Sequence, residues 1–216
     1  MTRSLDVKNY FDPFYTTVHA ITRLRRDQLA LLLPYFEVVS FTRKSLLLQD
    51  GEVENYLSLV LRGMVRKYVQ LKNQGEVTLQ LATEGHFIQS DISFNFRRPS
   101  EVLLEALEPC IVVRLHYNKM EEMMVRHPWM EEVGRILAGA MAEKRDARIY
   151  NLLKQTPRER FIAYMQKHPT MLQRVPQKIL ASYLNIQPET FSRLKHLMRK
   201  RSGDEDPTHS PQAQVW

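Results

Sequence analysis

A run of short strand-like segments between Val38 and Tyr117 is the feature that most constrains the fold. Seven stretches rich in aliphatic and β-branched residues follow one another there, and turn-forming residues separate them. Many short strands with closely spaced turns are typical of a jelly roll or a small barrel. The stretches are 38–41, 46–48, 56–61, 64–69, 77–81, 102–107 and 110–115, with turn signals at Gly51, Gly63, Gly75, Gly85 and Pro109.

Helical patterns flank the strand region on both sides. Apolar residues recur at helical spacing over 16–37, where Pro34 interrupts the run. After the strands, Asn118 is expected to cap a short helix that stops before Pro128, because the residue before a proline disfavours the α region. No proline occurs between Trp129 and Lys154, so one long helix is predicted there.

The predicted long helix carries a candidate interface for a second copy of the chain. Mostly apolar residues alternate three and four apart along one side, which is the spacing of paired helices, and small residues such as Gly134 and Ala138 permit close approach. The alternative is a helix that packs only on its own domain. We expect a homodimer through Met130, Val133, Leu137, Ala140 and Lys144.

The positive charge of the chain is concentrated near its C-terminal end. The net charge is +7, and residues 151–202 contain eleven Lys or Arg but only two acidic residues. The rest of the chain holds the other 20 basic and 22 acidic residues. Such a local basic field suits a polyanion, because neutralised phosphates release counterions. The alternative is an ordinary solvated basic surface.

The basic segment contains a pattern typical of a helix-turn-helix. Thr156, followed by Pro157 and by a glutamate at position 159, predicts a capping box at the start of the segment. Farther on, Asn185 suits a tight turn, since asparagine tolerates positive φ, and Ile186 would fill the corner between two helices. The first of these helices would begin at Pro176 with the small Ala181 at the crossing, and the second at Pro188 with Phe191, Leu194 and Leu197 facing inward.

The outer face of the second helix is predicted to contact DNA. A helix of this kind enters the major groove and presents side chains to base edges. Arg193 can donate two hydrogen bonds to guanine, and Glu189 can accept one from cytosine. The alternative is a plain helical hairpin inside a bundle. The expected base contacts are Gln187, Glu189, Thr190, Ser192 and Arg193, and the expected phosphate contacts are Lys178, Lys195, His196, Arg199 and Lys200.

Other classes of protein find little support in the sequence. No apolar run is long enough to cross a membrane, and the N-terminal residues contain no secretion signal, so we expect a cytoplasmic protein without membrane contact. The single cysteine, Cys110, excludes an internal disulfide and multi-cysteine metal sites and suits an apolar strand. Neither clustered histidines nor a nucleophile–base set appears, which disfavours an enzyme or a cupin-like barrel. We therefore expect no enzymatic activity, no cofactor and no metal.

With these motifs together, the chain resembles the Crp–Fnr family of bacterial transcription regulators, over roughly Leu24 to Arg201. The motifs in the strand region are 46–52, 59–65 and 85–88, and the likeness is greatest to members of the kind found in Bacteroidetes. The resemblance implies an α+β fold with an N-terminal β-roll, a long dimerisation helix and a winged helix-turn-helix whose wing lies near Gln166–Val175. The implied boundaries are 1–128 for the sensor domain, 129–154 for the dimerisation helix, 155–202 for the DNA-binding domain and 203–216 for a disordered tail.

The resemblance also identifies where this chain departs from its pattern. Family members that bind cyclic nucleotides use a Gly-Glu-Leu segment and an arginine followed by a small hydroxyl residue, and these positions become 89–91 and Ser100-Glu101. A phosphate would then face Glu101, so we predict that cyclic AMP binds poorly. Only a two-residue shift of the loop would bring Arg98 to the phosphate. The degenerate effector pocket comprises Gln89, Ser90, Arg98, Ser100 and Glu101.

The family's recognition helix often carries an Arg-Glu-x-x-x-Arg pattern that binds a guanine-rich half-site. Glu189 and Arg193 match this pattern, but Pro188 stands in place of the first arginine, which puts the usual half-site in doubt at one base pair. The prediction is a sequence-specific transcription regulator that binds double-stranded DNA as a homodimer and does not respond to cyclic AMP. A cyclic-nucleotide-responsive regulator is the alternative, and RNA polymerase and an unidentified small effector are further candidate partners.

Overall fold

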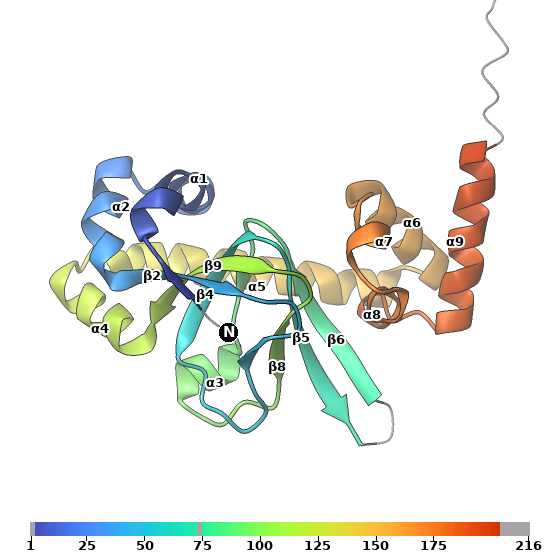
Figure 1. Ribbon diagram of the computed structural model, residues 1–216, viewed down its shortest axis with the longest axis horizontal. Coiled ribbons are helices and arrows are strands. Elements are labelled where there is room, and N and C mark those ends of the chain that lie inside the picture. Colours follow the sequence, from blue (N-terminus) through green and yellow to red (C-terminus); the bar gives the residue numbers. More distant parts are fainter. Residues whose placement is uncertain (1–2, 73–74, 204–216) are drawn as a thin grey trace, which may run out of the picture. The chain divides into compact units, whose positions relative to one another are not determined.

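The computed structural model describes residues 3–72 and 75–203. The chain divides into two compact units, of which unit 1 ends at Lys154 and unit 2 begins at Gln155 (Figure 1). The boundary falls at the position where the sequence predicts the end of the long helix. Of the predicted tail, 203–216, residues 204–216 lie outside the described residues, while Gly203 is the last residue of a helix.

Unit 1 contains a β-roll made of two antiparallel sheets. The five-stranded sheet has the order β1-β2-β9-β4-β7, and the four-stranded sheet has the order β3-β8-β5-β6. The strands are β1 (Arg3–Leu5), β2 (Phe36–Phe41), β3 (Leu46–Leu48), β4 (Tyr56–Arg62), β5 (Val65–Leu71), β6 (Gly75–Ala82), β7 (Phe87–Ile88), β8 (Leu103–Ala106) and β9 (Cys110–His116).

The seven strands predicted from the sequence are confirmed as β2 to β6, β8 and β9. Strands β7 and β1 were missed, because β7 has only two residues and β1 (Arg3–Leu5) lacks the aliphatic run that marks β3. The turn at Gly63 needs its glycine for two reasons. Its φ is 87°, and a Cβ atom there would lie 2.5 Å from the carbonyl oxygen of Pro109 and 2.8 Å from the Cα of Cys110.

The core of the roll lies between the two sheets. Side chains from both sheets meet there, including the fully buried Val60, Val65 and Val112. Cys110 belongs to the same cluster and is only 2% exposed, as its apolar strand predicts. Burial raises the pKa of its thiol to about 12, so this cysteine is a packing residue rather than a reactive thiol.

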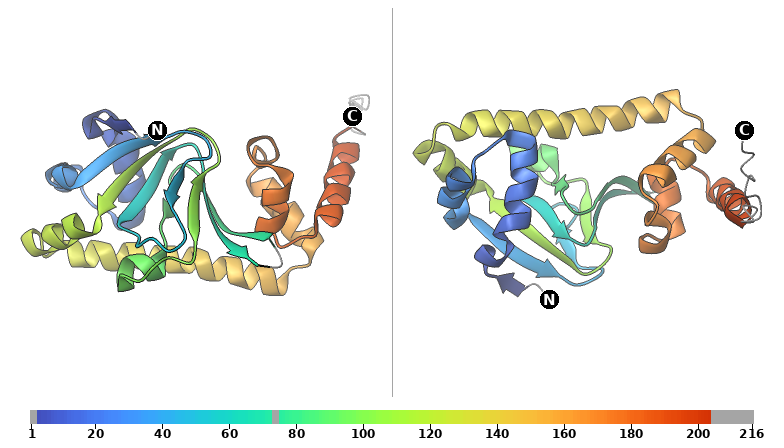
Figure 2. Two further views of the ribbon diagram at one scale, coloured as in Figure 1. Left: turned by 60° about the horizontal axis from the view of Figure 1, so that its bottom comes forward. Right: turned by 90° about the horizontal axis from the view of Figure 1, so that it is seen from above.

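Helices cover the outside of the roll and pack on a second apolar cluster, which includes Phe14, Leu29 and Met123. Figure 2 shows the longest of them, α5, running beside the roll, and α5 contacts both α1 and α4. The helices of unit 1 are α1 (Phe11–Thr22), α2 (Arg26–Leu32), α3 (Asp91–Phe96), α4 (Tyr117–Arg126) and α5 (Met130–Lys154), with 3-10 turns at Val7–Tyr10 and Leu33–Tyr35.

Two sequence expectations for these helices were wrong. The helical pattern expected over 16–37 breaks at Arg23 as well as near Pro34, because Arg23 adopts a left-handed conformation (φ 60°) and donates its N–H to the carbonyl of His19, which ends α1. Residues 36–37 already belong to β2. Asn118 does not cap α4; His116 does, since its ring nitrogen accepts the N–H of Asn118 at 3.1 Å. Histidine is not among the preferred capping residues, so sequence gave no reason to choose it.

Unit 2 is a bundle of four helices: α6 (Pro157–Lys167), α7 (Met171–Arg174), α8 (Gln177–Tyr183) and α9 (Pro188–Gly203). The capping box at Thr156 is confirmed by reciprocal hydrogen bonds with Glu159. The wing expected near Gln166–Val175 is wrong, because residues 155–203 contain helices and no strand. Met171 and Val175, four residues apart, are 4% and 3% exposed and bury one side of the short helical turn that takes the wing's place.

Among the described residues, no helix combines the length and the apolar character that crossing a bilayer would require.

Candidate functional site

The turn between α8 and α9 has the geometry that its sequence predicts. Asn185 has a φ of 50°, and Ile186 is 5% exposed in the corner between the helices. The N–H of Ile186 donates to the carbonyl of Ala181 at 2.9 Å, and that of Asn185 to the carbonyl of Ser182 at 3.1 Å. These two bonds form a Schellman motif, which ends α8 sharply and fixes where α9 starts.

A buried arginine, which the sequence did not single out, holds this turn. Arg160 on α6 is 8% exposed, and its guanidinium donates to the carbonyls of Leu184 and Asn185, each at 2.8 Å. A third bond reaches the carbonyl of Gln155, immediately after α5. Charged donors make strong hydrogen bonds to carbonyls, so Arg160 ties both the turn and the start of unit 2 to α6.

The inner side of α9 is anchored mainly by one aromatic contact. Phe191 is 1% exposed and meets Phe161 of α6 edge to face, with ring centroids 5.1 Å apart. Leu194 is half-buried, but Leu197 is 56% exposed, so the expectation that Leu197 faces inward is wrong. The close helix contacts of α9 are with α6 and α8, and Phe191 and Leu194 lie in its first two turns.

The outer side of α9 presents polar side chains. All five residues predicted to contact bases are exposed: Gln187, Glu189, Thr190, Ser192 and Arg193. Among the predicted phosphate contacts, Lys178 and His196 are exposed and Lys195 is half-buried. The side chains of Arg199 and Lys200 lie outside the described residues. The first turns of α9 therefore expose several polar side chains on a helix that Phe191 anchors to α6.

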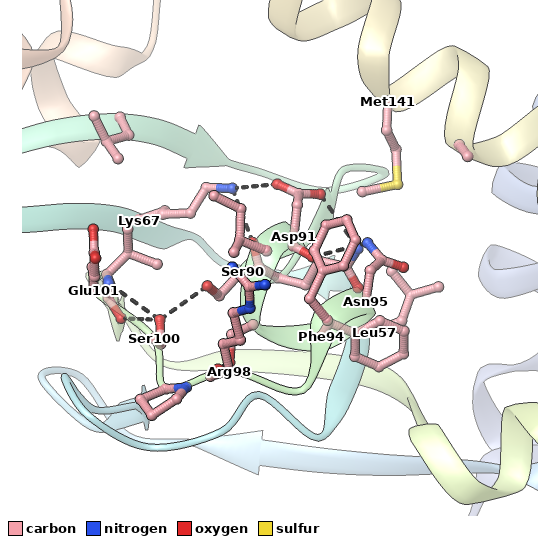
Figure 3. A pocket seen from close by; sticks show the side chains of 18 of the residues that line it. Leu57, Lys67, Ser90, Asp91, Phe94, Asn95, Arg98, Ser100, Glu101 and Met141 are labelled. Carbon is pink, nitrogen blue, oxygen red and sulfur yellow. Dashed lines mark hydrogen bonds and ion pairs between the residues drawn. The ribbon is translucent and has the colours of Figure 1, made fainter.

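A second candidate site is a cavity of about 1330 Å³ inside unit 1 (Figure 3). Its walls come from α3, the loop before β8, strands β5 and β6, and helices α4 and α5. All five residues of the predicted effector pocket line this cavity: Gln89, Ser90, Arg98, Ser100 and Glu101.

Polar side chains on one wall of the cavity bind one another. Lys67 donates to a carboxylate oxygen of Asp91 at 3.0 Å and to the carbonyl of Gln89 at 2.9 Å. The side-chain amide of Gln89 donates to the other oxygen of Asp91 at 3.3 Å. Arg145 on α5 lies 3.9 Å from the same carboxylate. Asp91 is thus the centre of a small polar network on this wall.

The residues that replace the family's nucleotide-binding motifs lie on the neighbouring wall. The hydroxyl of Ser100 donates to that of Ser90 at 2.9 Å, and both serines are buried. Arg97 is directed elsewhere, because its guanidinium binds the carbonyl of Glu54 and stacks 4.3 Å from the ring of Tyr117. Arg98 is exposed and extends into the space between Ser90 and Phe94 (Figure 3).

Helix α5 supplies much of the apolar wall. Gly134, Leu137, Ala138 and Met141 line the cavity, and Figure 3 shows Met141 pointing into it. Leu137 therefore faces its own unit. Met130 is 7% exposed within the core of unit 1, and Val133 packs against that core. Of the five predicted dimer residues, Ala140 is half-buried and Lys144 is exposed.

Residues 38–127 match the family model of the cyclic nucleotide-binding domain. The match covers β2 to β9, α3 and α4, which include most of the cavity wall. No curated protein sequence matches the chain significantly.

Several solved structures share the fold. FixK2 from Bradyrhizobium japonicum is 16% identical with a TM-score of 0.62, and the alignment covers 76% of this chain and 85% of that one. CLP, a c-di-GMP-responsive global regulator from Xanthomonas campestris, is 16% identical with a TM-score of 0.61 and coverage of 81% and 91%. The catabolite activator protein of Thermus thermophilus is 21% identical with a TM-score of 0.53 and coverage of 86% and 88%. These neighbours are Crp–Fnr-type regulators, whereas the Bacteroidetes kinship stays a prediction.

Proposed function

We propose that this chain is a sequence-specific DNA-binding transcription regulator that acts as a homodimer. The observation that carries the proposal is the outer face of α9, where four polar side chains, with Gln187 just before the helix, are exposed above the anchor residue Phe191. The Asn185 turn and the bonds of Arg160 set the angle at which that helix leaves the bundle. The structural neighbours include a protein named as a global regulator and another named as an activator, which supports the same class.

The groups on α9 suit contacts with a duplex. Arg193 can bind guanine with two hydrogen bonds, Glu189 can accept one from cytosine, and shorter side chains such as Ser192 suit either base. Basic residues around them would contact phosphates, which position the protein without specifying sequence. A homodimer would bind an inverted repeat whose half-sites lie about 34 Å apart, one helical turn.

The test is selection of bound duplexes from a random DNA library by the full chain at near-physiological salt. We expect enrichment of a two-fold symmetric site, together with a mass in solution of twice the chain. Binding that depends on salt but ignores sequence, both with and without a metabolite extract, would contradict the proposal. A monomer that selects a single asymmetric half-site would contradict the homodimer alone.

Dimerisation would leave the cavity side of α5 against its own unit. Leu137 and Met141 line the cavity, and Ala140 and Lys144 lie at the edge of the same helix side, so a second copy would contact α5 along that edge. Ala140→Glu should then weaken self-association, because it places a large charged group at the closest approach of two helices. Gly139→Glu is the matched control, because Gly139 lies on the opposite side of the helix from Leu137 and has open space around its Cβ position.

Our proposal includes poor binding of cyclic AMP. A buried Ser100 occupies the position at which the family pattern has an arginine, so that position offers no positive charge to a cyclic phosphate. The competing candidate is a cyclic-nucleotide-responsive regulator, which the family match and the position of Arg98 in the cavity favour. Calorimetry with cyclic AMP decides between them: micromolar binding that is lost in Arg98→Gln supports the competing candidate, and absence of binding supports ours.

A further inference from the structure

We infer that the cavity of unit 1 binds an amphipathic organic acid, a molecule with one carboxylate, an apolar body and a hydrogen-bond donor. This inference rests on the proposed function, because it treats the cavity as the effector site of the regulator.

One basic side chain of the cavity lining is available to pair with an anionic group. Lys67 is paired with Asp91, and Arg145 lies 3.9 Å from the same carboxylate. Arg98 is the one basic side chain of the lining for which the described residues show no carboxylate partner, and it extends into the cavity (Figure 3). Asp50 and Glu101 also line the cavity and would repel a second negative charge. A single carboxylate can pair with Arg98, whereas a dianion would also face Asp50 and Glu101.

Gln89 supplies a hydrogen-bond acceptor without a partner. The residue is 6% exposed and lines the cavity, and its amide oxygen has no hydrogen-bond partner among the described residues. The orientation of the amide is fixed, because its nitrogen must face the carboxylate of Asp91. A hydroxyl or N–H that a ligand brings beside Gln89 would satisfy the unpaired oxygen.

The wall opposite these polar groups suits an aliphatic or aromatic body. Helices α4 and α5 contribute only apolar or small side chains there, apart from Arg145: Met120, Met124, Gly134, Leu137, Ala138 and Met141. Methionine side chains adapt to irregular apolar shapes, and Gly134 leaves space for Met124 beside it. A purine would leave the polar edges of its ring unpaired against this wall, whereas a hydrocarbon chain or an aryl ring would not.

The experiment is calorimetry of the full chain with 3-hydroxydecanoate below its micelle concentration and with 3-phenyllactate, two acids that differ in the shape of their apolar body. We expect micromolar binding of at least one. Decanoate, which lacks the hydroxyl, should bind several-fold more weakly than 3-hydroxydecanoate, and 3-hydroxybutyrate, which lacks the apolar body, should not bind measurably.

Arg98→Gln should weaken binding at least about tenfold, since it removes the charge that pairs with the carboxylate. Arg43→Gln is the matched control, because Arg43 is exposed and does not line the cavity. Absence of binding by both acids, equal binding in Arg98→Gln, or tighter binding of cyclic AMP than of either acid would overturn the inference. DNA selection is measured separately, so specific DNA binding without acid binding overturns this inference alone, and acid binding without DNA specificity overturns the proposed function alone.

Discussion

The polar side chains of the two candidate sites differ in whether they bind other residues of the chain. Around the cavity of unit 1, polar groups mostly bind one another, as in the Lys67–Asp91 and Ser90–Ser100 pairs. On the outer face of α9, Glu189 and Arg193 are exposed and show no hydrogen bond or ion pair to the described residues. The cavity is therefore suited to a small molecule that satisfies a few remaining groups, and α9 to an extended partner that supplies all of them.

Each unit also contains a buried charged residue that binds backbone groups instead of lining a cavity or facing outward. In unit 2 the side chain of Arg160 is buried and donates to backbone carbonyls of its own unit. In unit 1 Glu54 is a carboxylate that is only 3% exposed and receives N–H groups from Tyr56 and Ser90. Substitutions of Arg160, Arg193 and Glu54 test the comparison. Their expected effects decrease in that order.

The largest effect is expected from Arg160→Met. The substitution removes hydrogen bonds to the carbonyls of Leu184 and Asn185 and leaves buried acceptors without donors, so the free energy of unfolding of unit 2 should fall by roughly 3 kcal/mol. Urea unfolding followed by circular dichroism measures the change. Arg158→Met, at an exposed position of the same helix, is the control and should change the free energy by less than about 0.5 kcal/mol. Equal effects of the two variants would show that Arg160 does not support the turn.

Arg160 also illustrates what the sequence could not reveal. It lies in a segment with eleven basic residues, all of which the sequence predicts to be exposed to solvent or to DNA. Nothing in the sequence pattern distinguishes the buried Arg160 from the others. The burial depends on carbonyls 24 and 25 residues farther along the chain. By contrast, the Asn185 turn was predictable, because positive φ and a buried apolar neighbour are both local properties of residue type.

The same distinction between local and distant causes holds in unit 1. Strands with several β-branched residues and glycine turns were predictable, whereas the break at Arg23 was not, since an arginine rarely adopts a left-handed conformation. The five effector-pocket positions came from the family pattern and do line one cavity. The contribution of α4 and α5 to that cavity depends on how those helices pack, which the sequence pattern leaves open.

A moderate effect is expected from Arg193→Ala, which tests the outward-facing half of the comparison. Loss of two hydrogen bonds to a guanine should weaken binding to the selected DNA site by about 1–3 kcal/mol and relax the preference at one base pair. Competition binding on the selected site and on single-base variants measures both quantities. Arg158→Ala should leave the base preferences unchanged, because its side chain lies on α6 rather than α9. An equal loss on all sequences would mean that Arg193 contacts only phosphate.

The smallest effect is expected from Glu54→Gln, and its sign depends on pH. Burial raises the pKa of the Glu54 carboxyl, although the N–H groups of Tyr56 and Ser90 oppose the shift. The folded state therefore binds the proton more tightly than the unfolded state, and the stability this provides below the unfolded-state pKa is lost as pH rises through the folded-state pKa. Glutamine keeps an oxygen that can accept the N–H of Tyr56 but carries no charge. Urea unfolding of both proteins should thus show Glu54→Gln gaining stability relative to the parent chain between pH 4 and pH 8, and a constant difference across that range would mean that the carboxylate is already fully compensated in its buried position.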